Sequence, residues 1–395
     1  MAEKSILFIH HGTIMGGAPV SLTLQVKGII NESNIQCRIA CNNEKMQKFF
    51  SKKEINSTPW PYTCNYLGKV LIRWSNANNL KGLYLLLRDC FLFPGSIMLQ
   101  VFALKKSKER IVHLNSAVLF SSAIAAKITG KKIVWHIREA SHIPKTVASI
   151  IYYFSDRIVC ISPVEASRFG GKREKVTVVY NPVNFIQFNP DKYNRLCIRR
   201  ELGIPENANV VVTLGGVNPR KGTAEIISGI KKCDTEVFAI IVGPELQQKS
   251  NNPYHKNISE MCQGETKSKV IFTGIVENPA PYIIASDVLT FIGKTPHFPR
   301  PVFEAWAAKT PVIVNEMEGI SNNVDHGMNG FVISEPIDDT LAENFDLLFN
   351  NHDLLDKMGA EGYKKAVEYT SPEKSAKKLE SIFQEIFSSL GVQDS

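Results

Sequence analysis

The stretch FIGKTPHFPRPVFEAWAAKTPVIV, residues 291–314, begins and ends with a short apolar run. Between the two runs lie a Pro-rich loop and a segment of helix length. Uninterrupted Val/Ile-rich runs joined through a helix are typical of parallel strands that are buried on both faces of a sheet. The stretch therefore predicts a strand–loop–helix–strand unit of an α/β fold. The carboxylate of Glu304 lies near the start of the predicted helix, where a ligand hydroxyl or phosphate would approach.

Apolar runs of this kind recur along the whole chain, separated by longer mixed segments. They occupy residues 6–10, 37–41, 111–114, 133–137, 158–161, 176–180, 210–214, 237–242, 270–273, 288–292, 311–314 and 330–333. So many parallel strands exceed one ordinary sheet, and we predict two doubly wound, Rossmann-like sheets.

The join between the two predicted domains lies where turn residues cluster, at 181–184 and again at Asn189-Pro190. We expect a first domain over residues 1–184 and a second over 185–371. The segment 372–395 holds an amphipathic helix that we expect to pack back on the first domain. Ligands of such sheets bind outside the carboxyl ends of the strands, so we expect the functional site in a cleft between the domains.

The composition is that of a soluble globular protein. The chain has 395 residues, of which 44% are hydrophobic and 21% are charged. No apolar run reaches the roughly 20 residues that span a bilayer, and the N-terminus MAEKSILFIHHG indicates a first strand rather than a signal peptide. Eight cysteines without a C-x-x-C pair disfavour a zinc site or a disulfide framework and suit free thiols in a reducing cytoplasm.

Charge is distributed unevenly between the two halves. Residues 1–182 hold 25 Lys and Arg against 10 Asp and Glu, and the remainder holds 21 against 28. The basic half is expected to meet an anionic partner, although solubilising lysines explain the same excess. No nucleic-acid recognition motif is present, and an anionic membrane surface fits better because the apolar stretch 83–104 leads into the basic run 105–110. A buried helix pair with a polar exit is the alternative.

Two Gly-containing loops follow predicted strands and suit anions. Gly16 and Gly17 lie just before a predicted helix, where backbone N–H groups can approach an anion, although a tight turn explains them equally and no G-x-G-x-x-G is present. Arg220 and Lys221, flanked by glycines after the first strand of the second half, suit a diphosphate: Arg as a planar fork and Lys as a point charge. A solvated surface pair is the alternative there.

A third group of ionisable residues, His136, Arg138 and Glu139, ends the strand 133–137 and is expected to point toward the cleft. His136 could equally be a core histidine, and Arg138 could simply pair with Glu139. The chain contains no Asp-x-Asp and no His/Cys/carboxylate cluster with metal spacing. It also lacks G-x-S-x-G and a P-loop, so hydrolase and kinase activities have no support.

Seven motifs in register make the chain resemble the retaining glycosyltransferases of family 4, which have the GT-B fold. They are GGAP (16–19), IVWHIRE (133–139), VVYNPVNFIQFNP (178–190), LGGVNPRKG (214–222), FTGIVENPAPYIIASD (272–287), FPRPVFEAWAAKTPVI (298–313) and EGISNNVDHGMNGFVI (318–333). The resemblance covers nearly the whole chain.

The resemblance implies a role for each matching residue of the donor site. Glu304 would accept hydrogen bonds from the donor ribose, Arg220 and Lys221 would hold the diphosphate with Gly16 and Gly17 beside it, main-chain groups near Val276 would bind the base, and the backbone N–H groups around Arg300 and Val302 would face the phosphates.

Three positions depart from the family pattern. The first Glu of the E-x7-E motif falls on Pro296, an Arg often found early in the phosphate loop falls on Gly216, and the acceptor-side His falls on Arg138. The absent Glu is expected near the transferred sugar, which leaves the donor sugar open.

The resulting hypothesis is a metal-independent, retaining transferase without a cofactor. It would move a sugar from a nucleotide-diphosphate sugar to a glycan or lipid-linked acceptor in bacterial-type surface polysaccharide synthesis, with Arg138, Glu139, Arg220 and Lys221 as catalytic residues. We expect a cytoplasmic protein, peripheral on the inner face of the membrane, with no nucleic-acid partner. The alternatives are a catalytically weak nucleotide-binding partner subunit, motivated by Pro296, and a sugar-nucleotide epimerase of similar fold.

Overall fold

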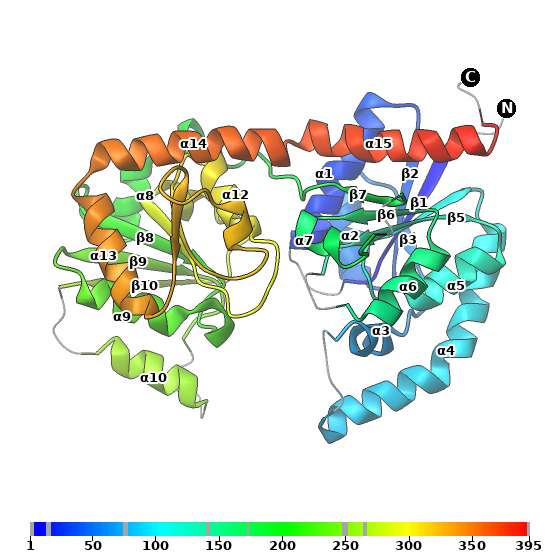
Figure 1. Cartoon of the computed structure of the whole chain (residues 1–395), viewed down its shortest axis with the longest axis horizontal. Helices are drawn as coiled ribbons and strands as arrows, with labels where there is room; N and C mark the ends of the chain where they lie inside the picture. Colours follow the sequence, from blue (N-terminus) through cyan, green and yellow to red (C-terminus); the bar gives the residue numbers. More distant parts are fainter. Residues whose placement is uncertain are drawn as a thin grey trace. The chain divides into compact units, whose positions relative to one another are not determined.

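The chain divides into two compact units in the computed structural model, which describes residues 4–12, 17–73, 78–139, 143–171, 174–246, 252–263 and 267–392. Unit 1 comprises Met1–Pro182 together with Pro372–Ser395, and unit 2 comprises Val183–Ser371. Each unit is built on its own parallel sheet with helices on both faces (Figure 1). The division falls two residues before the 184/185 boundary expected from the turn residues.

Unit 1 contains a seven-stranded parallel sheet in the order β3-β2-β1-β4-β5-β6-β7. The strands are β1 (Ser5–His10), β2 (Gln36–Cys41), β3 (Ser57–Pro59), β4 (Ile111–Leu114), β5 (Lys132–Ile137), β6 (Arg157–Cys160) and β7 (Val176–Val178). Six of them match predicted apolar runs. The exception is the edge strand β3, whose three residues are polar or exposed and so lack the apolar signal of a buried strand.

Unit 2 contains a six-stranded parallel sheet in the order β10-β9-β8-β11-β12-β13. The strands are β8 (Asn209–Leu214), β9 (Val237–Val242), β10 (Lys269–Gly274), β11 (Val288–Phe291), β12 (Val312–Asn315) and β13 (Gly330–Ile333). In both sheets the first strand of the unit lies in the middle, so the chain winds outward in both directions. The predicted fold class, two doubly wound parallel sheets, is confirmed.

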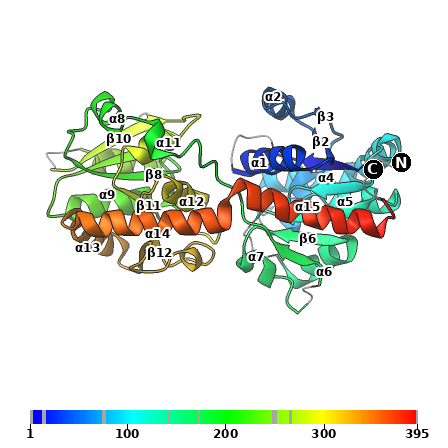
Figure 2. The ribbon, with the colours of Figure 1, turned by 90° about the horizontal axis from the view of Figure 1, so that it is seen from above.

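The helices of unit 1 include one from the far end of the chain. They are α1 (Gly17–Glu32), α2 (Glu44–Lys52), α3 (Asn65–Leu71), α4 (Leu80–Lys106), α5 (Phe120–Ile128), α6 (Lys145–Phe154), α7 (Pro163–Ser167) and α15 (Pro372–Ser389). Helix α15 packs beside α1, as Figure 2 shows. The two helices approach closely at Gly28, where an added Cβ would lie 2.4 Å from the Cβ of Ala376. Phe383 and Phe387 join the same core as Phe8 of β1.

The helices of unit 2 cover its sheet in the same way. They are η1 (Pro190–Lys192), α8 (Arg195–Glu201), η2 (Pro219–Lys221), α9 (Thr223–Lys232), α10 (Pro253–Met261), α11 (Ala280–Ile284), α12 (Arg300–Ala307), η3 (Ser321–Asn323), α13 (Ile337–Phe349) and α14 (His352–Thr370). The sheet residues Val211, Ala239 and Ile313 pack with Phe345 and Leu348 of α13 in one core. The strand–helix–strand unit predicted for residues 291–314 is β11–α12–β12.

The alternative of a buried helix pair over residues 83–104 is wrong. The structure has a single helix there, α4, which continues through Pro94. One side of α4 packs against α3 and α5, and the other side is exposed. By length and composition α4 is the one helix of the described chain that could cross a membrane, although only 17% of its apolar window is buried inside the protein.

Candidate functional site

The loop after β8 places Lys221 at the carboxyl edge of the unit 2 sheet. Gly215 and Gly216 have φ angles of 137° and 65°, which side-chain-bearing residues rarely adopt. A Cβ on Gly216 would lie 2.4 Å from the backbone nitrogen of Pro244, so only glycine lets the two loops approach so closely. The short helix η2 and then α9 follow, and they hold Lys221 and Thr223 in place.

Lys221 lies in a half-enclosed site beside His297 and Phe291. Its Nζ atom is 3.0 Å from His297 Nε2 and 4.5 Å from the centre of the Phe291 ring. His297 Nδ1 lies 2.6 Å from the carbonyl oxygen of Thr295, so Nδ1 carries the proton and Nε2 accepts from the ammonium. Burial lowers the pKa of Lys221 to about 8, and burial together with Lys221 lowers the pKa of His297 to about 4. At neutral pH the pair is a lysine cation held by a neutral imidazole.

Arg220 precedes this lysine and is exposed. Its backbone N–H donates to the side chain of Asn218, and its carbonyl accepts from the N–H of Lys294 at 3.1 Å. The backbone is therefore fixed on both sides while the guanidinium faces solvent. Arg220 and Lys221 thus place an exposed guanidinium and a half-buried ammonium in the loop after β8, and their role in holding a diphosphate stays a prediction.

Glu304 lies in α12 with only 7% of its surface exposed. Arg300, one turn earlier, donates from Nε to Glu304 Oε1 at 2.7 Å. Burial raises the pKa of Glu304, and the charge and hydrogen bond of Arg300 oppose that rise. The carboxylate is thus an internally paired group rather than a freely exposed one.

The backbone N–H groups expected to face phosphates have internal acceptors in this structure. The N–H of Arg300 donates to the carbonyl of Phe298 at 3.0 Å, and the N–H of Val302 donates to that of Pro299 at 2.9 Å. These bonds form the first turn of α12, so a phosphate at that position would have to displace them. The ring of Phe298 stacks on Phe303, with an interplanar angle of 7°, and holds the turn against the helix.

His297 is the residue of this site that sequence reasoning missed. It follows Pro296, the position where the family pattern has a Glu, and it approaches Lys221 from the loop between β11 and α12. An added Cβ on Gly319 would lie 3.0 Å from the carbonyl oxygen of His297, so that loop and the one after β12 pack tightly. In the sequence His297 is a single histidine in the segment Pro296-His297-Phe298-Pro299, and a single histidine without a partner at a fixed spacing does not indicate a binding site.

Val276 lies in the loop after β10, at the carboxyl end of the edge strand, and is half-buried. A cavity of about 410 Å³ opens close by in the same unit, lined by residues that do not include Val276. These lining residues are Glu245, Leu246, Ser259, Cys262, Gln263 and Phe272. A second cavity, of about 280 Å³, is lined by Asp287 and Pro311 at the amino ends of β11 and β12, on the edge opposite the predicted site residues.

Arg138 organises the carboxyl edge of the unit 1 sheet. Its guanidinium donates to three side-chain amide oxygens: Asn115 at 2.6 Å, Asn181 at 2.5 Å and Gln25 at 2.6 Å. Asn115 follows β4, Gln25 belongs to α1 and Asn181 precedes the end of unit 1, so one side chain ties three segments together. Asn115 in turn donates from Nδ2 to His10 Nδ1 at 3.0 Å.

The alternative of a side-chain pair between Arg138 and Glu139 is not what the structure shows. The carboxylate of Glu139 accepts from the hydroxyl of Ser116, from the backbone N–H of Ala117 at 2.8 Å and from that of Arg138 at 3.1 Å. Burial raises the pKa of Glu139, and these hydrogen bonds oppose the rise. Glu139 therefore closes the loop after β4 onto the loop after β5.

His136 does not point out of the sheet edge, so that expectation is wrong. It is fully buried in β5, with Nδ1 at 3.1 Å from His113 Nε2 on the neighbouring strand β4. Burial, and then the charge of Arg138, hold the pKa values of both rings well below the usual range of histidine. The core-histidine interpretation is the correct one.

The other predicted features are the Gly16-Gly17 loop, the cysteines and the absence of a metal site. Gly17 is the first residue of α1 and is exposed, and Gly16 lies outside the described residues. All eight cysteines are free thiols. In the described part of the chain, no group of three or more His, Cys, Asp or Glu side chains is arranged to hold a metal ion.

Comparisons with known proteins agree with this architecture. Residues 194–365 match the family model described as glycosyl transferases group 1. The N-acetyl-alpha-D-glucosaminyl L-malate synthase of Bacillus anthracis is 22% identical over 192 residues, which are 48% of this chain and 49% of that protein. The lipopolysaccharide core biosynthesis glycosyltransferase LpsD of Rhizobium meliloti is 27% identical over 211 residues, 52% and 57% of the two chains. The chain thus spans about half the length of these curated relatives.

A solved structure aligns over almost the entire chain. The crystal structure of Anabaena Alr3699/HepE in complex with UDP and glucose has a TM-score of 0.76 and 18% sequence identity, and the alignment covers 97% of this chain and 100% of that one. At such identity the likeness shows the fold. Residues 194–365 thus form a domain of the glycosyl transferases group 1 family, and the whole chain, with its two doubly wound parallel sheets, has the GT-B fold of glycosyltransferases.

Proposed function

We propose that this protein transfers a sugar, with retention of configuration and without a metal ion, from a nucleotide-diphosphate sugar to a hydroxyl of a glycan or lipid-linked acceptor. The observation that carries the proposal is Lys221, a partly desolvated ammonium held by His297 at the carboxyl edge of the unit 2 sheet. This edge is where doubly wound sheets bind ligands. The exposed guanidinium of Arg220 beside it suits the second phosphate.

The proposed reaction requires that negative charge on the leaving diphosphate be stabilised. As the bond between the sugar C1 and the phosphate oxygen breaks, the sugar becomes oxocarbenium-like and charge develops on the diphosphate. Lys221 and Arg220 would stabilise that charge, and the low polarity around Lys221 strengthens its effect. The acceptor oxygen then bonds to C1 from the face that the phosphate leaves, and its proton passes to the departing phosphate oxygen. No protein nucleophile takes part.

Glu304 is assigned to the ribose of the donor. Arg300 occupies its Oε1 atom, so we assign Oε2 as the acceptor for a ribose hydroxyl. The hydrogen bond from Arg300 opposes the rise in the pKa of Glu304 that burial causes, and so favours the ionised carboxylate, the stronger hydrogen-bond acceptor. The acceptor substrate is assigned to unit 1, where Arg138 and Glu139 brace the sheet edge.

The proposed setting of the reaction follows from the acceptor class. The similarity to LpsD, whose name places it in lipopolysaccharide core synthesis, supports a bacterial surface polysaccharide. Such an acceptor carried on a lipid suits a cytoplasmic enzyme that is peripheral on the inner membrane face, and the basic N-terminal half suits the same location.

The test is a binding and turnover series with the whole chain. Titration calorimetry against UDP, GDP and ADP identifies the base, beginning with UDP because the HepE structure contains it. Donor hydrolysis and transfer are then measured, and NMR of the product reports the configuration at the anomeric carbon. We expect Lys221→Ala and Glu304→Ala to lower turnover at least about tenfold, since each removes a hydrogen bond to a charged group. Unchanged turnover in both variants would overturn the proposal.

A nucleotide-binding subunit without activity of its own is the second candidate, because Pro296 stands where the family pattern has a carboxylate. Tight nucleotide binding without any hydrolysis or transfer would establish it. Interconversion of a free sugar nucleotide without an acceptor would instead establish an epimerase.

A further inference from the structure

Helix α4 has its polar and apolar sides reversed relative to an ordinary surface helix. Its fully buried residues are Gly82, Asp89, Ser96, Gln100 and Leu104. A surface helix normally turns its apolar stripe to the core and its polar side to water. On α4, three polar side chains face the protein and most of the large apolar side chains face outward.

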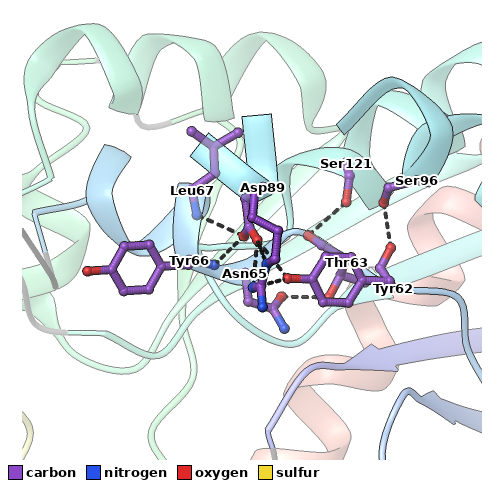
Figure 3. Close-up of polar contacts among 9 residues, drawn as sticks. Tyr62, Thr63, Asn65, Tyr66, Leu67, Asp89, Ser96 and Ser121 are labelled. Carbon is purple, nitrogen blue, oxygen red and sulfur yellow. Dashed lines mark hydrogen bonds and ion pairs between the residues drawn. The ribbon is translucent and has the colours of Figure 1, made fainter. Parts of the chain in front are cut away.

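Asp89 ties the first half of α4 to the rest of unit 1 (Figure 3). Its carboxylate accepts from the Tyr62 hydroxyl at 2.6 Å and from the backbone N–H groups of Tyr66 at 2.8 Å and Leu67 at 3.1 Å. Arg88 adds an ion pair at 2.8 Å. The carboxylate thus caps α3 and holds α4 against it.

Gln100 ties the second half in the same way. Its Oε1 atom accepts from Trp60 Nε1 at 3.2 Å and from the Ser122 hydroxyl at 2.6 Å. Its Nε2 atom donates to the Ser121 hydroxyl at 3.0 Å, and Ser96 donates to the carbonyl of Tyr62. Directional hydrogen bonds at both ends therefore fix which side of the helix faces outward.

The outward side is an apolar stripe with Pro94 and Gly95 at its centre. Nine large apolar side chains of α4 are exposed, and six of them fall within about 60° of one another on an ideal helix, opposite Asp89 and Gln100. These six are Leu80 (88% exposed), Tyr84 (65%), Leu87 (61%), Phe91 (84%), Met98 (57%) and Phe102 (56%). The stripe runs the whole helix, about 40 Å for 27 residues. Soluble surfaces rarely leave so large an apolar patch uncovered.

Cations flank the stripe at both ends. Lys81 lies beside Leu80, and Lys105 and Lys106 end the helix, with Lys108 and Arg110 just beyond. All five are exposed. Long basic side chains can extend from an apolar surface toward lipid headgroups while their stems stay in contact with the acyl boundary.

We propose that the outward stripe of α4 is a lipid-docking surface, on which the helix lies flat in the headgroup region of an anionic membrane. The apolar side chains would enter the acyl boundary and the flanking cations would meet anionic headgroups. This surface does not depend on the sugar-transfer chemistry, and it would hold unit 1 at the surface where a lipid-linked acceptor is found.

Two other occupants fit the same stripe less well. A membrane-spanning arrangement would strip Asp89 and Gln100 of their partners and place them in hydrocarbon. A second copy of α4 packed antiparallel would bring Lys81 near Lys105 and Lys106 of the other copy. Packed parallel, each of these lysines would lie near its own counterpart, so positive charges would repel in either arrangement. Pro94 and Gly95 also interrupt the stripe at its centre and leave no side chain of the kind that interlocks in a helix pair.

The test is co-sedimentation of the full chain with vesicles of phosphatidylcholine alone or mixed with phosphatidylglycerol. We expect binding to the anionic vesicles, weakened by raised salt. Phe91→Ser/Phe102→Ser should lower vesicle affinity at least about tenfold, because each large apolar group leaves the acyl boundary. Lys105→Gln/Lys106→Gln should weaken binding to anionic vesicles about 30-fold, because each basic residue near the surface contributes roughly 1 kcal/mol.

The matched control is Tyr153→Ser/Ile186→Ser, which removes two large, well-exposed apolar side chains elsewhere, at 70% and 78% exposure. This control should bind vesicles like the unaltered chain. The proposal is overturned if the unaltered chain stays in the supernatant with anionic vesicles, or if the α4 variant and the control bind alike. It is equally overturned if ultracentrifugation shows a dimer that Phe91→Ser/Phe102→Ser dissociates while vesicle binding is absent.

Discussion

The Lys221 ammonium and the neutral His297 ring form a hydrogen bond of 3.0 Å, although the two residues are 76 positions apart in the chain. Lys221 follows β8 and His297 follows β11, and these strands are neighbours in the sheet. The bond therefore exists because two strand ends meet at one edge. It holds a cation in place before any phosphate arrives.

The first prediction concerns the pH dependence of nucleotide binding. Because burial lowers the pKa of Lys221 to about 8, the free protein loses this positive charge as the pH rises through that value. Affinity for a nucleoside diphosphate should be highest near pH 7 and fall between pH 7.5 and 9.5, about tenfold per unit at its steepest. Calorimetry across this range measures the effect. Lys221→Met should abolish the inflection, whereas the exposed Lys231→Met should keep it; an inflection that survives in Lys221→Met would refute the assignment.

The second prediction concerns acid stability. His10 and His297 have pKa values of about 3 and 4, both lowered chiefly by burial, so the folded chain keeps them neutral while the unfolded chain binds protons below pH 6.5. Stability should therefore fall as the pH drops below 6.5, by up to about 1.4 kcal/mol per pH unit for each buried ring.

Thermal unfolding between pH 7 and pH 4.5 provides the measurement for this acid effect. His297→Gln should make the pH dependence shallower, and the exposed His352→Gln should leave it as in the unaltered chain. Equal slopes in all three proteins would mean that His297 does not contribute.

The third prediction concerns Arg138. Lysine in its place cannot reach three amide oxygens in one plane, so Arg138→Lys should release the contacts to Asn115, Asn181 and Gln25 and cost about 1–3 kcal/mol of stability. If unit 1 binds the acceptor, turnover should fall while the nucleotide dissociation constant stays the same. Steady-state kinetics and calorimetry separate the two effects, with the exposed Arg110→Lys as the control. Weakened nucleotide binding would argue against a role confined to the acceptor side.

The fourth prediction concerns the attachment of α4. Asp89→Asn removes the charge and one acceptor site, so one or more of its donors loses a partner and unit 1 should lose about 1–3 kcal/mol. Despite burial, the hydrogen bonds from Tyr62 and Arg88 lower the pKa of Asp89. The contribution of ionised Asp89 to the free energy of unfolding is thus fully present above pH 3.8, the ordinary pKa of an aspartate, and is lost as the pH falls through the pKa of Asp89 in the folded chain. Urea unfolding at pH 7 tests the variant against the exposed neighbour Cys90→Ser; identical midpoints would mean that the network is dispensable.

The strands and the site differ in how far the sequence predicts them. Apolar runs such as 237–242 become buried strands because a doubly covered parallel sheet demands continuous hydrophobicity. The edge strand β3 was missed because an edge strand packs against only one neighbour and needs no such run. The glycines at 215 and 216 were recognisable, since a tight loop after a strand requires their backbone freedom.

Sequence patterns did not predict which side chains form hydrogen bonds with one another. Arg138 beside Glu139 suggested a local ion pair, yet the guanidinium binds amide oxygens from three separate segments and the carboxylate binds a different loop. His136 at a strand end suggested an exposed ring, yet the pleat of β5 directs it into the core beside His113. Each outcome depends on which neighbouring strand supplies the partner.

The amino-acid sequence alone determined the α/β class, the two parallel sheets and the place of Arg220 and Lys221 just after a strand, because periodicity and turn chemistry are local properties of the chain. Only the tertiary structure decided that His297 holds Lys221, that Glu304 is buried and that α4 turns its apolar side outward. Those features arise from contacts between segments far apart in the sequence. The apolar content of α4 is local, but the direction it faces is set by the buried hydrogen bonds of Asp89 and Gln100 with residues outside the helix.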